Sequence, residues 1–140
     1  MLKFSRKTEY ALLAIEHMIH KREMQGPESV SSVREISEMY HIPFPLLAKV
    51  LQQLAGKGFV KATHGLRGGY LLAKTPQSIT LANLVEVFDG PLVVAECFKR
   101  TKISCPQWDG CTIKSPFTIL NHKLQELLSQ TTLADLTAKP

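Results

Sequence analysis

Acidic residues are missing from a long central part of this chain, because neither aspartate nor glutamate occurs between Glu38 and Glu86. The same stretch carries the basic residues Lys49, Lys57, Lys61, Arg67 and Lys74. Residues 1–75 hold 11 Lys and Arg against 6 Asp and Glu, whereas residues 76–140 hold 6 of each, so the whole excess of +5 lies in the first part. Phosphate contacts supply much of the affinity for nucleic acid, so a basic surface without carboxylates favours a polyanionic partner.

Long apolar runs and cysteines are also scarce. No run approaches the roughly 18 apolar residues of a membrane span, and the segment Met1–Lys7 lacks the apolar core of a secretory signal. We therefore expect a cytoplasmic protein with no membrane partner, in which thiols stay reduced. The three cysteines fall between Cys97 and Cys111, and their odd number suits a metal site better than a disulfide framework.

The central region reads as helix, turn, helix and a two-stranded ribbon. Apolar residues at helical spacing mark one helix face at Ile36, Met39 and Tyr40 and another at Leu46, Leu47, Val50, Leu51 and Leu54. Pro43 stops the first helix, and Pro45 suits the first turn of the second. Phe59–Val60 and Tyr70–Leu72 predict strands joined by a glycine-rich loop. This order predicts a winged helix whose second helix enters the major groove of DNA.

A further helix is predicted on the N-terminal side of this region. Ser5 suits the cap of a helix that runs to about Lys21. We interpret His17 within it as a packed histidine rather than a ligand. Ser32 and Glu35 fit a capping box at the start of the next helix.

The C-terminal half is predicted to contain a short helix capped by Thr80, an irregular stretch over 95–115 and a long helix that begins near Ser115. Ile119, Leu120, Leu124, Leu127 and Leu128 give the long helix an apolar stripe. This stripe can pack within the same chain, against a second copy of itself, or both. Because a small domain has few places to bury it, we expect a homodimer whose two recognition helices read a palindromic operator in double-stranded DNA. The predicted fold is mainly α with a small β-wing, in which 1–78 form the winged helix-turn-helix and 79–140 the cysteine loop and dimerisation helix of one compact domain.

The cysteines follow the pattern Cys97-x7-Cys105-x5-Cys111. This spacing differs from the paired C-x2–4-C of a zinc knuckle and from the C-x2-C-x2-C of ferredoxins. An irregular stretch of about 20 residues is long for a compact domain, and three thiolates closing on one metal centre would order it. The alternatives are inert buried thiols and a thiol–disulfide switch without metal.

Several motifs resemble those of the IscR/NsrR-type bacterial transcription regulators, and the resemblance covers nearly the whole chain. The motifs are Tyr10-Ala11-Leu12, LAKVLQQL at 47–54, GLRGGY at 65–70 and the three cysteines downstream. The resemblance implies a dimeric winged-helix repressor or activator whose DNA affinity depends on an iron–sulfur cluster. It also implies that Cys97, Cys105 and Cys111 hold that cluster.

The wide first cysteine interval is closer to NsrR-type members, which are nitric-oxide sensors with a 4Fe–4S cluster, than to IscR-type members with 2Fe–2S. Some members place a histidine three residues after the last cysteine, where this chain has Lys114, which cannot ligate at neutral pH. Others use an acidic residue just before the aromatic residue of the first helix. The resemblance therefore makes Glu9, reaching the cluster of the partner subunit, the candidate fourth ligand, ahead of His122.

Candidate DNA contacts follow from both the resemblance and the winged-helix geometry. Basic and hydroxyl groups at a helix start suit phosphates, and arginine in a wing suits the minor groove. The candidates are Ser5, Arg6 and Lys7 in the first helix, Pro43, Phe44, Pro45 and Lys49 in the recognition helix, and Thr63, His64, Arg67 and Gly68 in the wing. IscR-type members carry a glutamate where this chain has Ala48, so we expect a different base preference.

The leading hypothesis is a transcription regulator that senses nitric oxide, oxygen, redox state or iron–sulfur status through its cluster. The alternative is a metal-free winged-helix regulator or protein-docking module controlled by a partner protein, a small molecule or thiol oxidation. We do not expect an enzyme, because no Ser/His/Asp or Cys/His set and no phosphate-binding loop is readable in the sequence.

Overall fold

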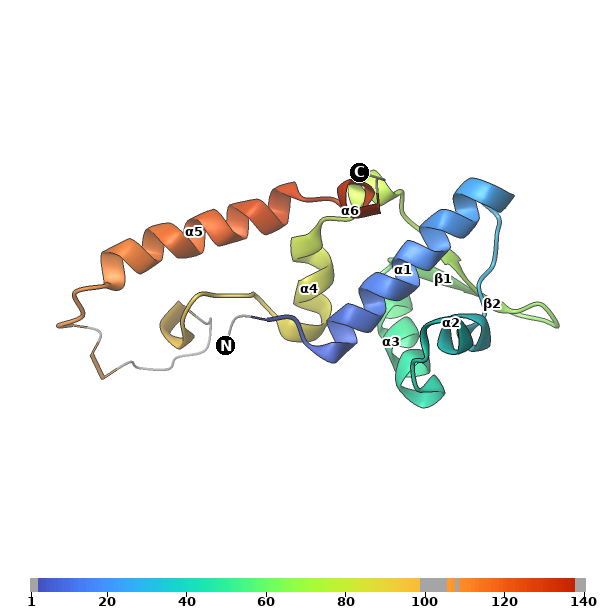
Figure 1. Cartoon of the computed structure of the whole chain (residues 1–140), viewed down its shortest axis with the longest axis horizontal. Coiled ribbons are helices and arrows are strands. Elements are labelled where there is room, and N and C mark those ends of the chain that lie inside the picture. The colour runs from blue at the N-terminus through green and yellow to red at the C-terminus, as the bar shows by residue number, and fades with distance from the viewer. Residues whose placement is uncertain (1–2, 99–105, 108, 138–140) are drawn as a thin grey trace.

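The computed structural model describes residues 3–98, 106–107 and 109–137, which form a helical body with one small sheet (Figure 1). The helices are α1 (Arg6–Gln25), α2 (Val33–Tyr40), α3 (Phe44–Gly56), α4 (Leu81–Asp89), α5 (Lys114–Gln130) and α6 (Leu133–Thr137), with two short 3₁₀ turns, η1 (Pro76–Ser78) and η2 (Glu96–Phe98). Strands β1 (Val60–Thr63) and β2 (Gly69–Leu72) complete the set. This is the mainly α architecture with a small wing that the sequence predicts. None of the described helices is long and apolar enough to cross a membrane.

Helix α1 is the central helix of the N-terminal half and contacts α2, α3 and α4. The hydroxyl of Ser5 accepts the backbone N–H of Thr8 at 3.3 Å, which confirms the predicted cap. The helix runs four residues beyond the predicted end at Lys21, because it stops only where Gly26 adopts a positive φ of 97°. Ala11, Ala14, Ile15, Met18 and Ile19 are buried, so α1 contacts its neighbours on more than one side.

The helix-turn-helix forms as predicted, with two local differences. The hydroxyl of Ser32 accepts the N–H of Glu35 at 3.0 Å, but the Glu35 side chain turns towards α1 rather than closing the reciprocal half of a capping box. Met39 is 59% exposed, so its expected place on the apolar face of α2 is wrong. The turn itself passes through His41 in the left-handed conformation (φ 55°), and the Ser37 hydroxyl donates to the Ile42 carbonyl at 2.6 Å.

The wing is an antiparallel hairpin in which Val60 pairs with Leu72 and Thr63 with Gly69. The first strand therefore begins one residue later than predicted and runs further. Ser31 and Tyr70 exchange two backbone hydrogen bonds of 2.8 Å, so the segment before α2 pairs with β2 on its other edge, close to the loop end of the hairpin. This pairing attaches the wing to the helix-turn-helix.

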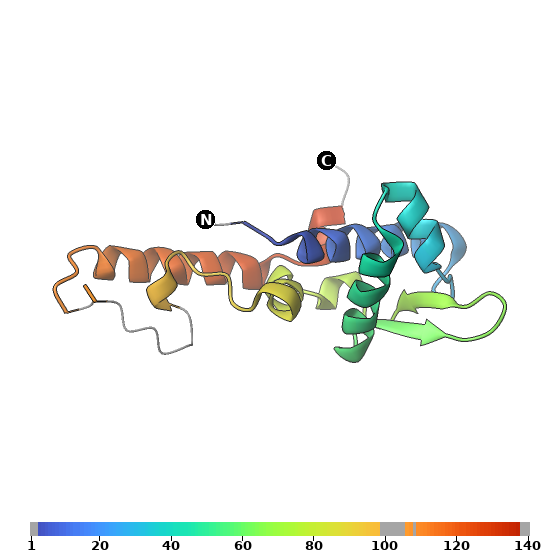
Figure 2. The same cartoon turned by 90° about the horizontal axis from the view of Figure 1, so that it is seen from below.

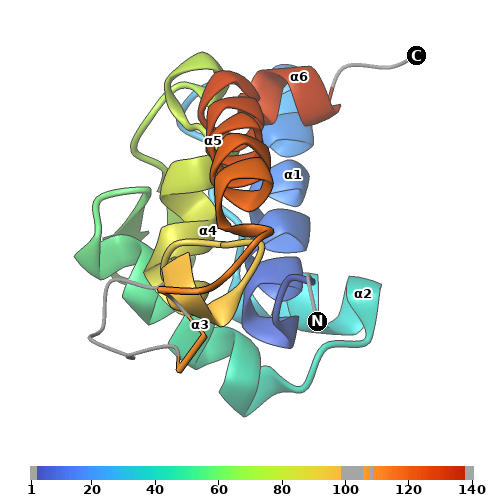
Figure 3. The same cartoon turned by 90° about the vertical axis from the view of Figure 1, so that its left-hand side faces the viewer.

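The C-terminal half extends away from the wing, and Figures 1 and 2 place α5 and the wing at opposite ends of the elongated chain. Helix α4 contacts both α1 and α5, and Leu81, Val85 and Leu128 form a small buried cluster between α4 and α5. The chain then returns, because Leu133 of α6 is buried and its N–H donates to the Ile79 carbonyl at 2.9 Å. In the end-on view of Figure 3, α6 lies beside α1.

Candidate nucleic-acid interface and cysteine-lined cavity

The recognition helix α3 separates its buried and exposed side chains cleanly. Leu47, Val50, Leu51 and Leu54 are fully buried against the core, while Pro43, Phe44, Pro45 and Lys49 are exposed. Pro43 caps the helix without a side-chain hydrogen bond, and no acidic residue occupies the first turn. The positive end of the helix dipole therefore lies beside an exposed, carboxylate-free surface, which suits DNA.

The wing loop presents His64 and Arg67 to solvent and keeps Thr63 and Gly68 partly buried. The Thr63 hydroxyl donates to the Gly69 carbonyl at 3.4 Å. A Cβ on Gly68 would lie 2.9 Å from the Thr63 carbonyl oxygen, so the loop is closed tightly behind its basic residues. This packing holds Arg67 on a short, well-defined hairpin.

At the start of α1, Ser5 already makes hydrogen bonds within the protein, one of which the sequence does not indicate. The Ser5 hydroxyl already caps the helix, and the Ser5 backbone N–H donates to the Asp89 carboxylate at 3.0 Å. Arg6 is an exposed side chain that pairs with Glu9 at 3.5 Å, and Lys7 is exposed. Arg6 and Lys7 are thus accessible to a phosphate, whereas the hydroxyl of Ser5 already has a structural role.

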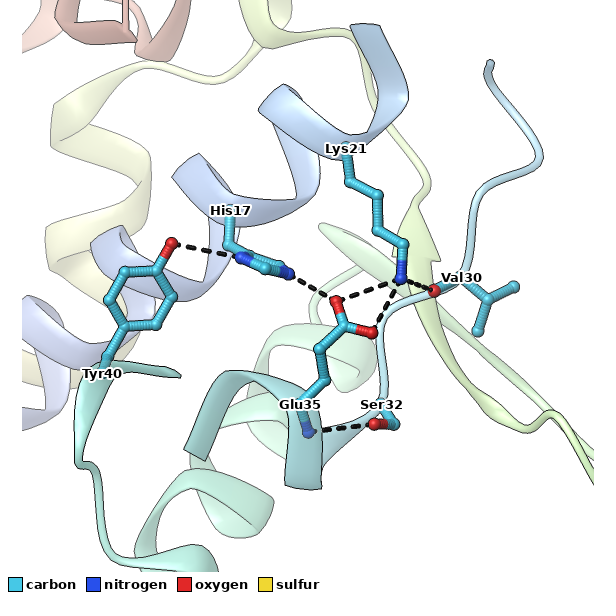
Figure 4. Close-up of polar contacts among 6 residues, drawn as sticks. All are labelled: His17, Lys21, Val30, Ser32, Glu35 and Tyr40. Atoms are coloured by element: carbon cyan, nitrogen blue, oxygen red, sulfur yellow. Dashed lines mark hydrogen bonds and ion pairs between the residues drawn. The ribbon is translucent and has the colours of Figure 1, made fainter. Parts of the chain in front are cut away.

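A polar network joins α1 to the helix-turn-helix (Figure 4). His17, 9% exposed, lies 3.1 Å from the Tyr40 hydroxyl through Nδ1 and 2.5 Å from the Glu35 carboxylate through Nε2. Lys21 donates to both Glu35 oxygens, at 2.8 and 3.0 Å, and to the Val30 carbonyl at 2.6 Å. His17 is therefore the packed histidine that the sequence predicts.

The network shifts the pKa values of Glu35 and Tyr40. Partial burial acts to raise the pKa of Glu35, but hydrogen bonds from Lys21 and His17 outweigh it and hold that pKa below 4.5. Burial and the nearby carboxylates of Glu16 and Glu35 raise the pKa of Tyr40. Glu35 is consequently ionised at neutral pH and stays paired with Lys21. This ion pair fixes the orientation of α2 against α1.

Cys97 and Cys111 line one cavity of about 300 Å³ with an almost entirely apolar wall. Both are free thiols and half-buried, and Phe98, Ile113 and Phe117 are among the other lining residues. The predicted ligand Cys105 and the neighbouring Trp108 lie outside the described residues. Within the described part of the chain, no three His, Cys, Asp or Glu side chains gather as a metal site.

The segment that carries Cys97 is attached to α5. The Asn121 side-chain oxygen accepts the Val94 N–H at 3.1 Å, and the Gln125 amide donates to the Leu92 carbonyl. These contacts bring Cys97, before the long loop, to the same cavity as Cys111, after it. Two cysteines lining one largely apolar cavity fit an iron–sulfur group, whose ligands are thiolates.

The remaining ligand candidates lie elsewhere in this single chain. Glu9 is exposed on α1, and His122 is exposed on α5; neither lines the cavity. Lys114, three residues after Cys111, does line it. A contact between Glu9 and this cavity would therefore need a second subunit.

Helix α5 leaves much of its apolar stripe uncovered. Leu128 is buried and Leu124 partly so, while Ile119, Leu120 and Leu127 are 61%, 50% and 62% exposed. Ile113, at the start of the helix, is also 51% exposed. Ile113, Leu120 and Leu127 recur every seven residues, the spacing of a helix that packs along a partner helix.

Sequence reasoning did not find Asp89 or Lys21. Asp89 binds Ser5 across 84 residues and Lys21 binds Glu35 across 14, and each belongs to a different helix from its partner. Sequence spacing predicts contacts only between neighbours on the same helix or strand. Neither of these contacts could therefore be predicted from the sequence.

Comparison with known proteins agrees with this architecture. A sequence model of the Rrf2 family, described as iron-dependent transcriptional regulator, matches residues 4–139. The HTH-type transcriptional regulator NsrR of Shouchella clausii is 28% identical over 129 residues, covering 92% of this chain and 84% of that protein.

Two solved structures are similar over nearly their whole length. CymR, the global cysteine regulator of B. subtilis, has a TM-score of 0.75 at 26% identity and covers 98% of this chain and 97% of that one. IscR of T. potens has a TM-score of 0.69 at 25% identity, covering 96% of this chain and 85% of that one. These relatives are regulators rather than enzymes. With the family match spanning almost every residue, this chain belongs to the Rrf2 family of winged-helix transcriptional regulators.

Proposed function

We propose that this regulator binds a palindromic DNA site as a homodimer and that an iron–sulfur cluster held by Cys97, Cys105 and Cys111 sets its DNA affinity. The observation that carries the proposal is the meeting of Cys97 and Cys111 at one apolar cavity. The iron dependence in the description of the family supports it. When bound, the cluster would supply a centre reactive towards nitric oxide, oxygen or loss of iron, with 4Fe–4S preferred over 2Fe–2S.

The groups that would bind DNA lie in α1, α3 and the wing, away from the cysteine-lined cavity. Lys49 of α3, His64 and Arg67 of the wing, and Arg6 and Lys7 of α1 are the exposed groups that would bind DNA. Pro43, Phe44 and Pro45 lead the recognition helix into the groove, and Thr63 and Gly68 shape the wing. Ser5 positions α1 through its cap.

Dimerisation would cover the exposed stripe of α5 with the same stripe of a second copy. Burying the remaining exposed surface of Ile119, Leu120 and Leu127 would gain about 1–2 kcal/mol for each, because each is already about half buried in the single chain. In such a dimer Glu9 of one subunit is the candidate fourth ligand for the other. Binding or loss of the cluster would then act through Glu9 on α1, the helix that precedes α2, α3 and the wing.

The proposal is tested by anaerobic purification followed by absorption spectroscopy and native mass spectrometry. We expect a brown protein with iron and sulfide bound, and Cys97→Ala, Cys105→Ala and Cys111→Ala should each bleach it. Thr112→Ala, an exposed neighbour of Cys111, is the matched control and should keep the colour. A colourless protein after iron–sulfide reconstitution, with zinc bound in equal amount to the chain, would refute the cluster and leave DNA binding intact.

Glu9 is tested separately. Glu9→Gln should change the rate at which nitric oxide or oxygen destroys the absorption, while Glu16→Gln, an equally exposed position on the same helix, should not. Equal rates in both variants would remove Glu9 from the ligand set.

A second candidate function is a metal-free thiol switch. It is favoured by the half-buried free thiols of Cys97 and Cys111 at one cavity and by the likeness to a cysteine regulator. Here oxidation of the iron-free protein, reversed by reductant, would change DNA affinity, and Cys97→Ser would abolish the change. DNA affinity that follows iron content and ignores thiol oxidation would exclude this function.

A further inference from the structure

The first turn of α3 exposes apolar surface at the place where a DNA reader normally carries polar groups. Phe44 is 49% exposed, and Pro43 and Pro45 on either side of it are exposed as well. A large aromatic side chain loses favourable free energy when it stays in water, so this position calls for an explanation.

The fold does not need Phe44 at this position. Ile42, before the cap, and Leu47, in the first turn, are 3% and 0% exposed and belong to one core cluster. They occupy the two positions, before the cap and four residues into the helix, at which buried apolar side chains fix how a chain enters a helix. Val50, Leu51 and Leu54 anchor the rest of α3, so Phe44 lies on the side that faces away from the core.

The same turn has little hydrogen-bonding capacity. Pro43 and Pro45 have no backbone N–H, and the Leu47 N–H is already bonded to the Pro43 carbonyl at 3.0 Å. Ala48, one turn after Phe44, is partly buried and carries only a methyl group. The exposed polar side chains of α3 begin further along, at Lys49, Gln52 and Gln53.

The surroundings indicate which partner would cover this apolar turn. No acidic residue occurs between Glu38 and Glu86, while Lys49 and the wing residue Arg67 are exposed. Such a surface is complementary to a polyanion. In the major groove of DNA the apolar group at the base edges is the 5-methyl of thymine, which aromatic and methyl side chains contact.

We propose that Phe44, flanked by Pro43 and Pro45, reads the 5-methyl groups of thymines in each half-site of the operator. This inference rests on the proposed DNA-binding function and assigns its specificity to one side chain. Lys49 follows five residues later and contributes charge, so Phe44 supplies specificity and Lys49 supplies electrostatic affinity from the same helix.

The experiment uses the full chain as purified. A preferred duplex is first selected from a random library, and each thymine in its half-sites is then replaced by deoxyuridine, which removes only the methyl group. We expect at least one replacement per half-site to weaken binding about fourfold, the effect of one buried methyl-sized group. In Phe44→Ala the same replacement should have no effect, while Phe44→Leu should keep part of it.

Lys49→Gln is the matched control in the same helix. It should weaken binding to the thymine and deoxyuridine duplexes equally and lower the slope of log affinity against log salt by about 1. Phe44→Ala should leave that slope unchanged, because it removes no charge. Melting temperatures of both variants close to that of the wild type verify that each is folded.

Other results would overturn the inference. Tight binding by the wild type that is insensitive to every deoxyuridine replacement would refute thymine reading and leave the proposed DNA-binding function standing. Failure to select any duplex would refute both. A Phe44→Ala variant that keeps the deoxyuridine effect but changes its oligomeric state would assign this apolar turn to a protein interface instead.

Discussion

The carboxylate of Asp89, the last residue of α4, accepts the backbone N–H of Ser5, the cap of α1, at 3.0 Å. The hydroxyl of buried Thr8 donates to the same oxygen at 2.8 Å. Because the chain runs from Asp89 directly into the segment that carries Cys97, this contact joins the cysteine end of the molecule to the start of the helix that bears Arg6 and Lys7. A negative charge at a helix N-terminus is also favourable by itself.

Replacing Asp89 with asparagine is therefore expected to destabilise the protein at neutral pH by about 1.5 kcal/mol, the low end of the range for hydrogen bonds to a charged acceptor. Burial acts to raise the pKa of Asp89, but the hydrogen bonds from Ser5 and Thr8 prevail and lower it from 3.8. A lowered folded-state pKa gives stability that is present above pH 3.8 and is lost as the pH falls through the folded value.

Urea unfolding of the wild type and Asp89→Asn between pH 7 and pH 3 tests this expectation. The difference between them should shrink as the pH falls, while Glu28→Gln, an exposed loop control, should match the wild type throughout. A constant difference would show that the carboxylate charge is not the source of the stability.

Glu35→Gln is expected to destabilise the protein by about 1–3 kcal/mol, because Lys21, 17% exposed, would keep its charge and lose its carboxylate. The pKa of Glu35 lies below 4.5, so this contribution is also present above that pH and is lost as the pH falls through the folded-state pKa. Thermal unfolding at pH 7 is the measurement. Glu38→Gln, exposed on the same helix, should melt with the wild type, and an equal loss in both variants would contradict the role given to the network.

Gly69→Ala is expected to loosen the attachment of the wing to the segment before α2. A Cβ there would lie 2.5 Å from the Ser31 carbonyl oxygen and 2.9 Å from Val30 Cγ1, and backbone on that side cannot move without breaking the Ser31–Tyr70 pairing. Overpacking of this kind costs about 1–3 kcal/mol. Amide hydrogen exchange at Tyr70 should accelerate in the variant.

Gly56→Ala provides the matched control, because a Cβ at Gly56 meets nothing within 4 Å and its φ is not in the left-handed region. That variant should be as stable as the wild type or slightly more stable. Wild-type protection of Tyr70 in Gly69→Ala would mean that the pairing tolerates a side chain.

Charging the exposed stripe of α5 is expected to separate the subunits. In Leu120→Lys/Leu127→Lys, two side chains that are 50% and 62% exposed in the single chain would place four cations in a symmetric interface. Sedimentation equilibrium should give the dimer mass for the wild type and for Lys123→Gln, an exposed position between them, and the monomer mass for the double variant. A double variant of dimer mass would move the interface away from this stripe.

Much of the fold was readable from local chemistry. Ser5 and Thr80 accept N–H groups three residues ahead, as capping residues should, and Pro45 sits in the first turn of α3. Apolar spacing located the buried face of α3 because each helix turn repeats the pattern within the sequence itself. The spacing failed at Met39, which has helical periodicity but stays 59% exposed among the residues that the structure describes.

The sequence predicted which residue types form the candidate site but not which of them lie next to one another. The basic bias, the glycine-rich wing and the clustered cysteines are properties of the sequence, since composition and short-range spacing define them. The packing of the helices decides that Cys97 and Cys111 line one cavity. It also decides that Glu35 bonds His17 and Lys21 and that Asp89 bonds Ser5. Such contacts join residues from different elements, and only the tertiary structure decides which elements are neighbours, because packing of buried side chains rather than local propensity sets their relative positions.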